Sequence, residues 1–150
     1  MTIEVEVQAV TSFEPVPDQQ AFARWAGAAL QGHDSAIVTV RLVDSEESRG
    51  LNSRFRGVDR PTNVLSFPAG LPAEIGIPLL GDLVICAPLV EAEALEQGKS
   101  PTDHWAHLTV HGVLHLLGYD HERGTSADAE RMEGKEREIF AMIHEEFLPG

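Results

Sequence analysis

The segment HGVLHLLGYDH restricts the fold of this chain more than any other stretch. It places His111, His115 and His121 four and six residues apart, with Gly118 between the second and the third. Two histidines four residues apart lie on one side of a helix, about 6 Å apart along its axis. Glycine readily adopts the left-handed conformation that ends a helix. The pattern therefore predicts a helix that stops at Gly118 and a loop that brings the third histidine back to the first two.

The start of this helix is also marked in the sequence. Ser100 can cap it, Pro101 suits its first turn, and Asp103 places a carboxylate near the positive end of the helix dipole. His104 and His107 share the face of the later histidines, but they lie further from the helix end. We expect these two histidines to pack or to support the site rather than to bind a metal.

Three imidazoles without a cysteine favour zinc and leave the fourth position of a tetrahedron for water. Nickel, cobalt and manganese are alternatives that the ligand type does not separate from zinc. An open position is more typical of a catalytic site than of a structural one. We therefore predict one zinc ion per chain, bound by His111, His115 and His121.

The remaining pattern predicts an α+β fold with a small mixed sheet of about four strands. The expected strands are IEVEVQAV, AIVTVRLV, TNVLSFP and GDLVICA, with the surface loop AGLPAEIGIPLLG before the last. Helices are expected after Asp18, after Asp44 with Glu47 as a capping box and Leu51 and Phe55 as its apolar residues, over residues 88–97, over 100–117, and after Thr125 with Asp128. The order β-α-β-α-β-β-α-α-α implies a parallel pair first and a long-looped hairpin later. The length of 150 residues suits a single domain, 1–150.

Composition limits the compartment and the partners. No segment resembles a signal peptide or a membrane span, and the single cysteine, Cys86, cannot form an internal disulfide. A cytoplasmic protein that does not use the membrane is therefore expected. The net charge of −13 counts against a protein that coats nucleic acid indiscriminately.

One stretch departs from this acidic character. Four of the eleven basic residues lie within twelve positions: Arg49, Arg54, Arg56 and Arg60. A solvated helix face is the simple explanation. A guanidinium can also bind phosphate oxygens in a fork, beside a zinc ion that polarises a phosphoryl group.

The residue after the first histidine decides between two kinds of zinc hydrolase. Zinc proteases of the HExxHxxGxxH type have a glutamate there as general base, whereas this chain has Gly112. A peptidase is therefore disfavoured, and the basic stretch favours a phosphodiesterase that acts on nucleic acid. Asp82, Asp120 and hydroxide at the metal are the candidates for a general base, although Asp120 is better suited to shaping the turn or orienting a ligand ring. Asn63 and Ser66 either line a cleft or pair at a strand end.

Three motifs together, HGVLHLLGYDH, RGVDRPTNVLSFP and LLGDLVICA, resemble the YbeY family of bacterial endoribonucleases. The resemblance is densest from Arg49 to His121. It implies a zinc-dependent, single-strand-specific ribonuclease that acts on the 3′ end of small-subunit ribosomal RNA and in ribosome quality control, with ribosomal or assembly proteins as partners. It also implies that His111, His115 and His121 hold the zinc and that Arg56 is the functional arginine. The alternative from another class is a non-catalytic ribosome-assembly factor whose metal is structural.

Overall fold

The computed structural model describes residues 3–33, 35–119 and 126–147. In these residues it contains one four-stranded mixed sheet, five α-helices and a short 3-10 helix. The elements in chain order are β1 (Ile3–Ala9), α1 (Gln19–Ala29), β2 (Ala36–Val43), α2 (Ser45–Arg56), β3 (Val64–Pro68), η1 (Ala73–Ile75), β4 (Leu79–Cys86), α3 (Ala87–Gln97), α4 (Pro101–Leu116) and α5 (Ser126–Phe147). The predicted α+β class and the predicted order of elements are confirmed.

The strands lie in the order β1-β2-β4-β3. β1 pairs with β2, and β2 with β4, in parallel, while β3 and β4 form an antiparallel hairpin. Both the predicted parallel pair and the predicted hairpin are therefore present. The connection between β3 and β4 is shorter than expected, because Leu79 and Leu80 already belong to β4. β3 forms one edge of the sheet, and this edge borders the cleft described below.

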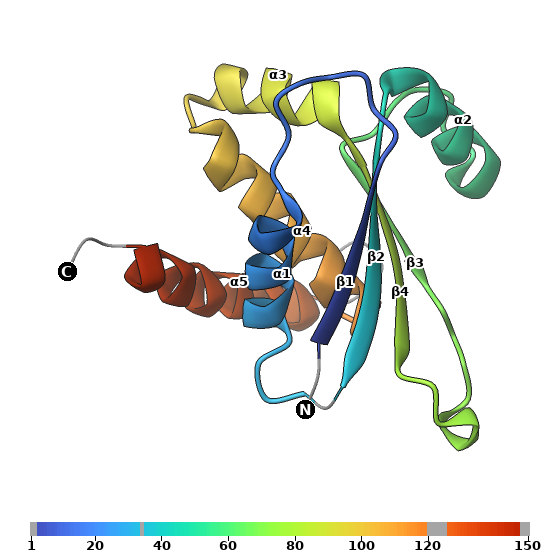
Figure 1. The fold of residues 1–150 in the computed structure, drawn as a ribbon, viewed down its shortest axis with the longest axis vertical. Coiled ribbons are helices and arrows are strands. Elements are labelled where there is room, and N and C mark those ends of the chain that lie inside the picture. Colours follow the sequence, from blue (N-terminus) through green and yellow to red (C-terminus); the bar gives the residue numbers. More distant parts are fainter. Residues whose placement is uncertain (1–2, 34, 120–125, 148–150) are drawn as a thin grey trace.

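Helices α1, α4 and α5 lie on one face of the sheet, and α2 lies on the other (Figure 1). The main core fills the first side, where the Phe22 ring meets Trp25 and Trp105 edge-on at centroid distances of 5.4 and 5.8 Å. A smaller cluster on the α2 side contains Leu65 and Cys86, both buried. Two-sided cover of this kind suits a sheet whose central strands are rich in β-branched residues.

Two predicted helix starts and the predicted end of α4 are confirmed. Asp18 accepts a hydrogen bond from the backbone N–H of Ala21 at 2.9 Å, and Ser100 Oγ accepts one from Asp103 at 3.1 Å. Gly118 has φ 102°, a backbone conformation that favours glycine. The chain therefore turns away from α4 at Gly118, three residues after His115.

The predicted capping box of α2 is wrong. Asp44 does occupy the N-cap position, but its carboxylate accepts hydrogen bonds from the Thr11 hydroxyl and from the backbone and hydroxyl of Ser12 instead of capping. These bonds, with Thr11 first, hold the pKa of Asp44 below its ordinary value. Glu47 pairs with Arg41, whose Nε lies 2.6 Å from Oε2. Residues from other parts of the fold therefore bind the Asp44 and Glu47 carboxylates, in place of the backbone N–H groups at the start of α2.

The other predicted cap, Thr125, lies outside the described residues, and α5 is described from Ser126 onward. Within the part of the chain that the structure describes, no helix has both the length and the hydropathy that crossing a membrane requires.

Candidate metal centre and cleft

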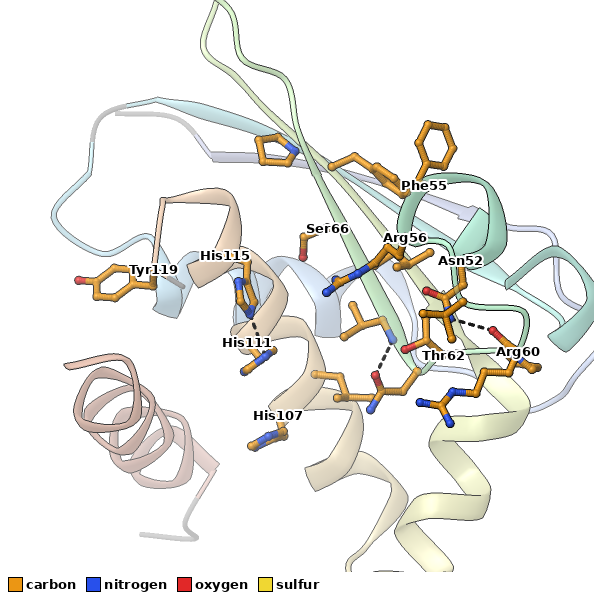
Figure 2. A pocket seen from close by; sticks show the side chains of 18 of the residues that line it. Asn52, Phe55, Arg56, Arg60, Thr62, Ser66, His107, His111, His115 and Tyr119 are labelled. Carbon is orange, nitrogen blue, oxygen red and sulfur yellow. Dashed lines mark hydrogen bonds between the residues drawn. The ribbon is translucent and has the colours of Figure 1, made fainter. Parts of the chain in front are cut away.

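Two of the predicted metal ligands face each other near the end of α4. The Nε2 atoms of His111 and His115 lie 3.1 Å apart (Figure 2). Two nitrogens bound to one tetrahedral zinc, each at about 2.0–2.1 Å, lie about 3.3 Å from each other. The spacing and the direction of the two rings therefore fit a shared metal ion. His121, the third predicted ligand, lies outside the described residues.

The His111 ring is held in place by a carboxylate from α5. Its Nδ1 lies 2.6 Å from Oε1 of Glu136, and both side chains are mostly buried, with 20% and 13% of their surface exposed. In the tautomer with its proton on Nδ1, the ring donates to the carboxylate and has Nε2 available to bind a metal. Metal-binding histidines usually have such a partner, which fixes both the tautomer and the ring orientation.

Glu136 is a site residue that the sequence analysis missed. A signal was present, because Met132, Ile139 and Ile143 of α5 are apolar and buried. Glu136 falls at helical spacing within this apolar series, where a carboxylate needs a partner. The partner itself is 25 residues away in the chain. Only the packing of α5 against α4 reveals it.

His107 lies beside the pair and completes a cluster that could hold a metal ion. Ligand atoms of His107, His111 and Glu136 all lie within 4.8 Å of one another. The His107 ring stacks on Phe140 at a centroid distance of 5.5 Å, and burial lowers its pKa. The distance between His111 and Glu136 is that of a direct hydrogen bond. The structure therefore favours Glu136 as the residue that orients His111, and not as a metal ligand, in a site centred on the Nε2 atoms of His111 and His115.

Another histidine–glutamate pair lies about two turns before His111, toward the N-terminus of α4. His104 is buried, and its Nε2 lies 2.9 Å from Oε1 of Glu93 in α3. Glu93 also accepts hydrogen bonds from the side-chain amide of Asn63, whose own Oδ1 accepts one from the backbone N–H of Val64. Asn63 therefore does both things that its position suggested, since it pairs at a strand end and also lines the cleft.

The histidines form one wall of a cleft of about 870 Å³ between α4, the edge strand β3 and the end of α2. Ser66 lies on β3 between the two sides, and its hydroxyl donates to the backbone carbonyl of Gly112 at 3.3 Å. Arg56 lines the opposite wall, and its guanidinium points toward the histidine pair (Figure 2). The cleft thus places a cation across from two imidazoles.

Buried polar side chains of α2 hold the wall that carries Arg56. Ser48 donates to the carbonyl of Thr62 at 2.8 Å, and the Asn52 amide donates to the carbonyl of Arg60 at 2.8 Å. Both side chains are buried, so the loop that follows α2 is fixed against the helix. These two hydrogen bonds therefore fix the loop that continues the wall after Arg56.

The four arginines of the basic stretch have different environments. Arg49 pairs with Asp59, with 2.7 Å between Nε and Oδ1, and the guanidinium lowers the pKa of that carboxyl. Arg54 lies over the Phe55 ring, while Arg56 and Arg60 line the cleft. The basic stretch is therefore partly a solvated surface, as the simple explanation holds, and partly a cleft wall.

Comparisons with known proteins agree with this architecture. A family model described as Endoribonuclease YbeY matches residues 7–144. A protein of that name from Alkalilimnicola ehrlichii is 57% identical over 145 residues, covering 93% of this chain and 86% of the relative. Another from Halorhodospira halophila is 54% identical over 132 residues, covering 85% of this chain and 84% of the relative. The chain belongs to the Endoribonuclease YbeY family.

Family membership confirms the resemblance of the three motifs and supports an endoribonuclease role. A solution structure from Thermotoga maritima has the same fold, with a TM-score of 0.60 at 24% identity over 97% of this chain and 94% of that one.

The position of Asp82 removes one candidate for the general base. Leu83 and Ile85 of β4 belong to the core under α4, whereas Val84 belongs to the cluster on the α2 side. Side chains alternate along a strand, so Asp82 shares the face of Val84. It therefore points away from the histidines of this YbeY family member. Asp120, the other carboxylate candidate, lies outside the described residues.

Gly112 has a packing reason beside the chemical one. A Cβ at this position would lie 2.7 Å from Cδ2 of Leu83, which is fully buried. Residue 112 thus faces the sheet and not the cleft. In this YbeY family member, a glutamate at the place that zinc proteases use for their base would point into the core.

Proposed function

We propose that this protein is a metal-dependent endoribonuclease that hydrolyses single-stranded RNA in the cleft between α4 and β3. The observation that carries the proposal is the arrangement of the two Nε2 atoms, 3.1 Å apart, across the cleft from Arg56. His111, His115 and His121 hold one zinc ion. Bound there, zinc lowers the pKa of a water molecule and polarises a phosphoryl oxygen.

The protein's own side chains do the rest of the work. Glu136 keeps the proton of His111 on Nδ1 and thereby keeps Nε2 available. The guanidinium of Arg56 binds two oxygens of the substrate phosphate in a fork, on the side opposite the histidines. Because negative charge grows on those oxygens during in-line attack, the same contact becomes stronger in the transition state.

The substrate class follows from the family and from the charge of the chain. Relatives are named endoribonucleases, and the motif resemblance extends this to the 3′ end of small-subunit ribosomal RNA and to ribosome quality control in the cytoplasm. A protein with net charge −13 gains little from general attraction to RNA. Substrate is therefore held by the local cations of the cleft and delivered by partners on the small ribosomal subunit.

Replacing Arg56 tests the proposal at the residue that contacts substrate. Arg56→Ala should lower RNA cleavage by two orders of magnitude or more, a size typical of lost transition-state contacts, with nearly unchanged melting temperature and metal content. Arg56→Lys should rescue only partly, because an ammonium cannot form the fork. Cleavage rates are measured on single-stranded RNA under single-turnover conditions.

Arg49→Ala is the matched control, since Arg49 lies on the same helix but pairs with Asp59 at the surface. It should cleave at close to the parental rate. Equal losses in the two variants would indicate a general charge effect, and parental cleavage by Arg56→Ala would refute the assigned contact.

A further inference from the structure

Phe55 is an apolar side chain that the fold leaves exposed. Its spacing from Leu51 predicts that both belong to the buried face of α2, but only Leu51 packs on the smaller core. Phe55 is 58% exposed and lines the mouth of the cleft. More than half of this apolar residue therefore remains in contact with water. Its surroundings indicate another use.

The Phe55 ring contacts another aromatic ring and lies near a guanidinium. Phe67 on β3 is half-buried and meets Phe55 at a centroid distance of 5.2 Å with the ring planes 70° apart. The guanidinium of Arg54 lies 5.6 Å from the centre of the Phe55 ring. An aromatic ring beside a cation at the rim of a positively lined groove is the usual composition of a surface that binds unpaired bases.

The neighbouring residue connects this ring to the proposed chemistry. Phe55 and Arg56 are consecutive, so their Cα atoms are about 3.8 Å apart and their side chains leave the helix about 100° apart. Figure 2 shows the consequence, with Arg56 directed toward the histidine pair and Phe55 directed away from it. One nucleotide can therefore contact both, its phosphate at Arg56 and its base at Phe55.

We propose that the Phe55 ring is a stacking platform for an unpaired RNA base next to the phosphate that Arg56 holds. The inference rests on the proposed function and adds to it a site that selects the strand state of the substrate. Bases inside a duplex are stacked on both faces and paired, so they cannot lie on this ring. Single strands expose the faces that it needs.

The first test uses the ring position as its own reporter. The two native tryptophans, Trp25 and Trp105, are 2% and 1% exposed, so the indole introduced by Phe55→Trp would be the accessible one. A short single-stranded 2′-O-methyl RNA should quench its fluorescence by stacking, and the matched duplex should not. Leu95→Trp is the control, because Leu95 is 85% exposed on α3 and outside the cleft.

The second test separates stacking from apolar cover. Phe55→Leu keeps an apolar group over Phe67 but has no aromatic face, so single-strand affinity should fall about tenfold with little change in melting temperature. Phe55→Trp should retain the parental affinity. An RNA with an abasic position at the contacted nucleotide should bind the parent and Phe55→Leu alike.

The possible outcomes separate a failure of the stacking platform from a failure of the proposed endoribonuclease function. A parent protein that binds and cleaves single-stranded RNA, with Phe55→Leu equal to it in affinity, overturns the platform alone. Equal quenching of the indole at position 55 by duplex and single strand does the same. A parent that neither binds nor cleaves RNA overturns the proposed function and the platform together.

Discussion

Gly112 shows at the scale of one residue how packing and chemistry can require the same side chain. α4 approaches β4 so closely there that a Cβ would clash with Leu83. The backbone carbonyl of the same residue accepts the Ser66 hydroxyl across the cleft floor. The missing glutamate that separates this chain from zinc proteases is therefore also a condition for seating the histidine helix on the sheet.

Restoring the protease-like residue should damage the fold without creating a peptidase. Gly112→Glu buries a carboxylate against Leu83, and we expect the free energy of unfolding to fall by about 3 kcal/mol or more. For a chain of this size that lowers the melting temperature by roughly 6–12 °C. Urea unfolding and a casein digest measure the two effects.

Gly134→Glu is the control for that substitution. Gly134 lies within α5, and the nearest group to an added Cβ is the Arg137 guanidinium at 3.8 Å. A glutamate there should change the free energy of unfolding by less than about 1 kcal/mol. Equal losses at the two glycines would show that close packing at residue 112 is not the cause.

At the scale of elements, the site depends on how three helices are placed around the cleft. α4 supplies the imidazoles, α5 supplies the carboxylate that orients one of them, and α2 supplies the arginine wall. None of these elements is adjacent to another along the chain except α4 and α5. The metal centre should therefore respond to changes on α5 that never contact the substrate.

Glu136→Ala is the direct test of that dependence. Loss of the partner frees the His111 ring to rotate and to change tautomer, so metal affinity should fall about 10–100-fold. Competition with a chelating dye measures it. Glu138→Ala on the same helix is the control, because the Glu138 side chain is 73% exposed and forms a surface ion pair with Lys135.

His107→Ala decides whether Glu136 orients His111 or binds the metal itself. If Glu136 only orients His111, removing His107 leaves the Nε2 pair intact, and metal affinity stays close to parental. If His107, His111 and Glu136 were the metal ligands, His107→Ala and Glu136→Ala would lose metal affinity to a similar extent. That second result would contradict the centre described here.

The stability that the Asp44 hydrogen bonds to Thr11 and Ser12 give to the fold should depend on pH. The pKa of Asp44 is below its ordinary value, so the carboxylate stabilises the fold above about pH 4 and loses this effect as pH falls through its folded pKa. Asp44→Asn should thus lower the free energy of unfolding at pH 7 and matter less near pH 3. A difference that is the same at both values, measured by urea unfolding, would contradict the assignment.

These elements also show where prediction from sequence stops. Strand and helix order, the Asp18 and Ser100 caps and the end of α4 at Gly118 are local, and local patterns predict them. Asp44 looks like a capping box because the pattern cannot show that Ser12 competes for its carboxylate. Glu136 and the exposure of Phe55 depend on contacts across the sheet and between helices.

At the scale of the whole molecule, an acidic protein places two of its eleven cationic residues in the wall of one cleft. The net charge of −13 is spread over the chain, while Arg56 and Arg60 line the same groove as the histidines. Such a distribution discourages binding to duplex nucleic acid in general and leaves recognition to contacts inside the groove. The family supports an endoribonuclease role, and we propose that contacts inside the groove select the substrate.

We propose that a metal held by the α4 histidines drives cleavage of single-stranded RNA. One purified sample should be assayed for metal content and RNA cleavage as isolated, after chelation and dialysis, and after zinc is returned. We predict about one metal per chain, loss of cleavage on chelation, recovery with zinc, and no recovery in His111→Ala or His115→Ala. RNA cleavage that continues at the same rate after the metal is gone would contradict the claim.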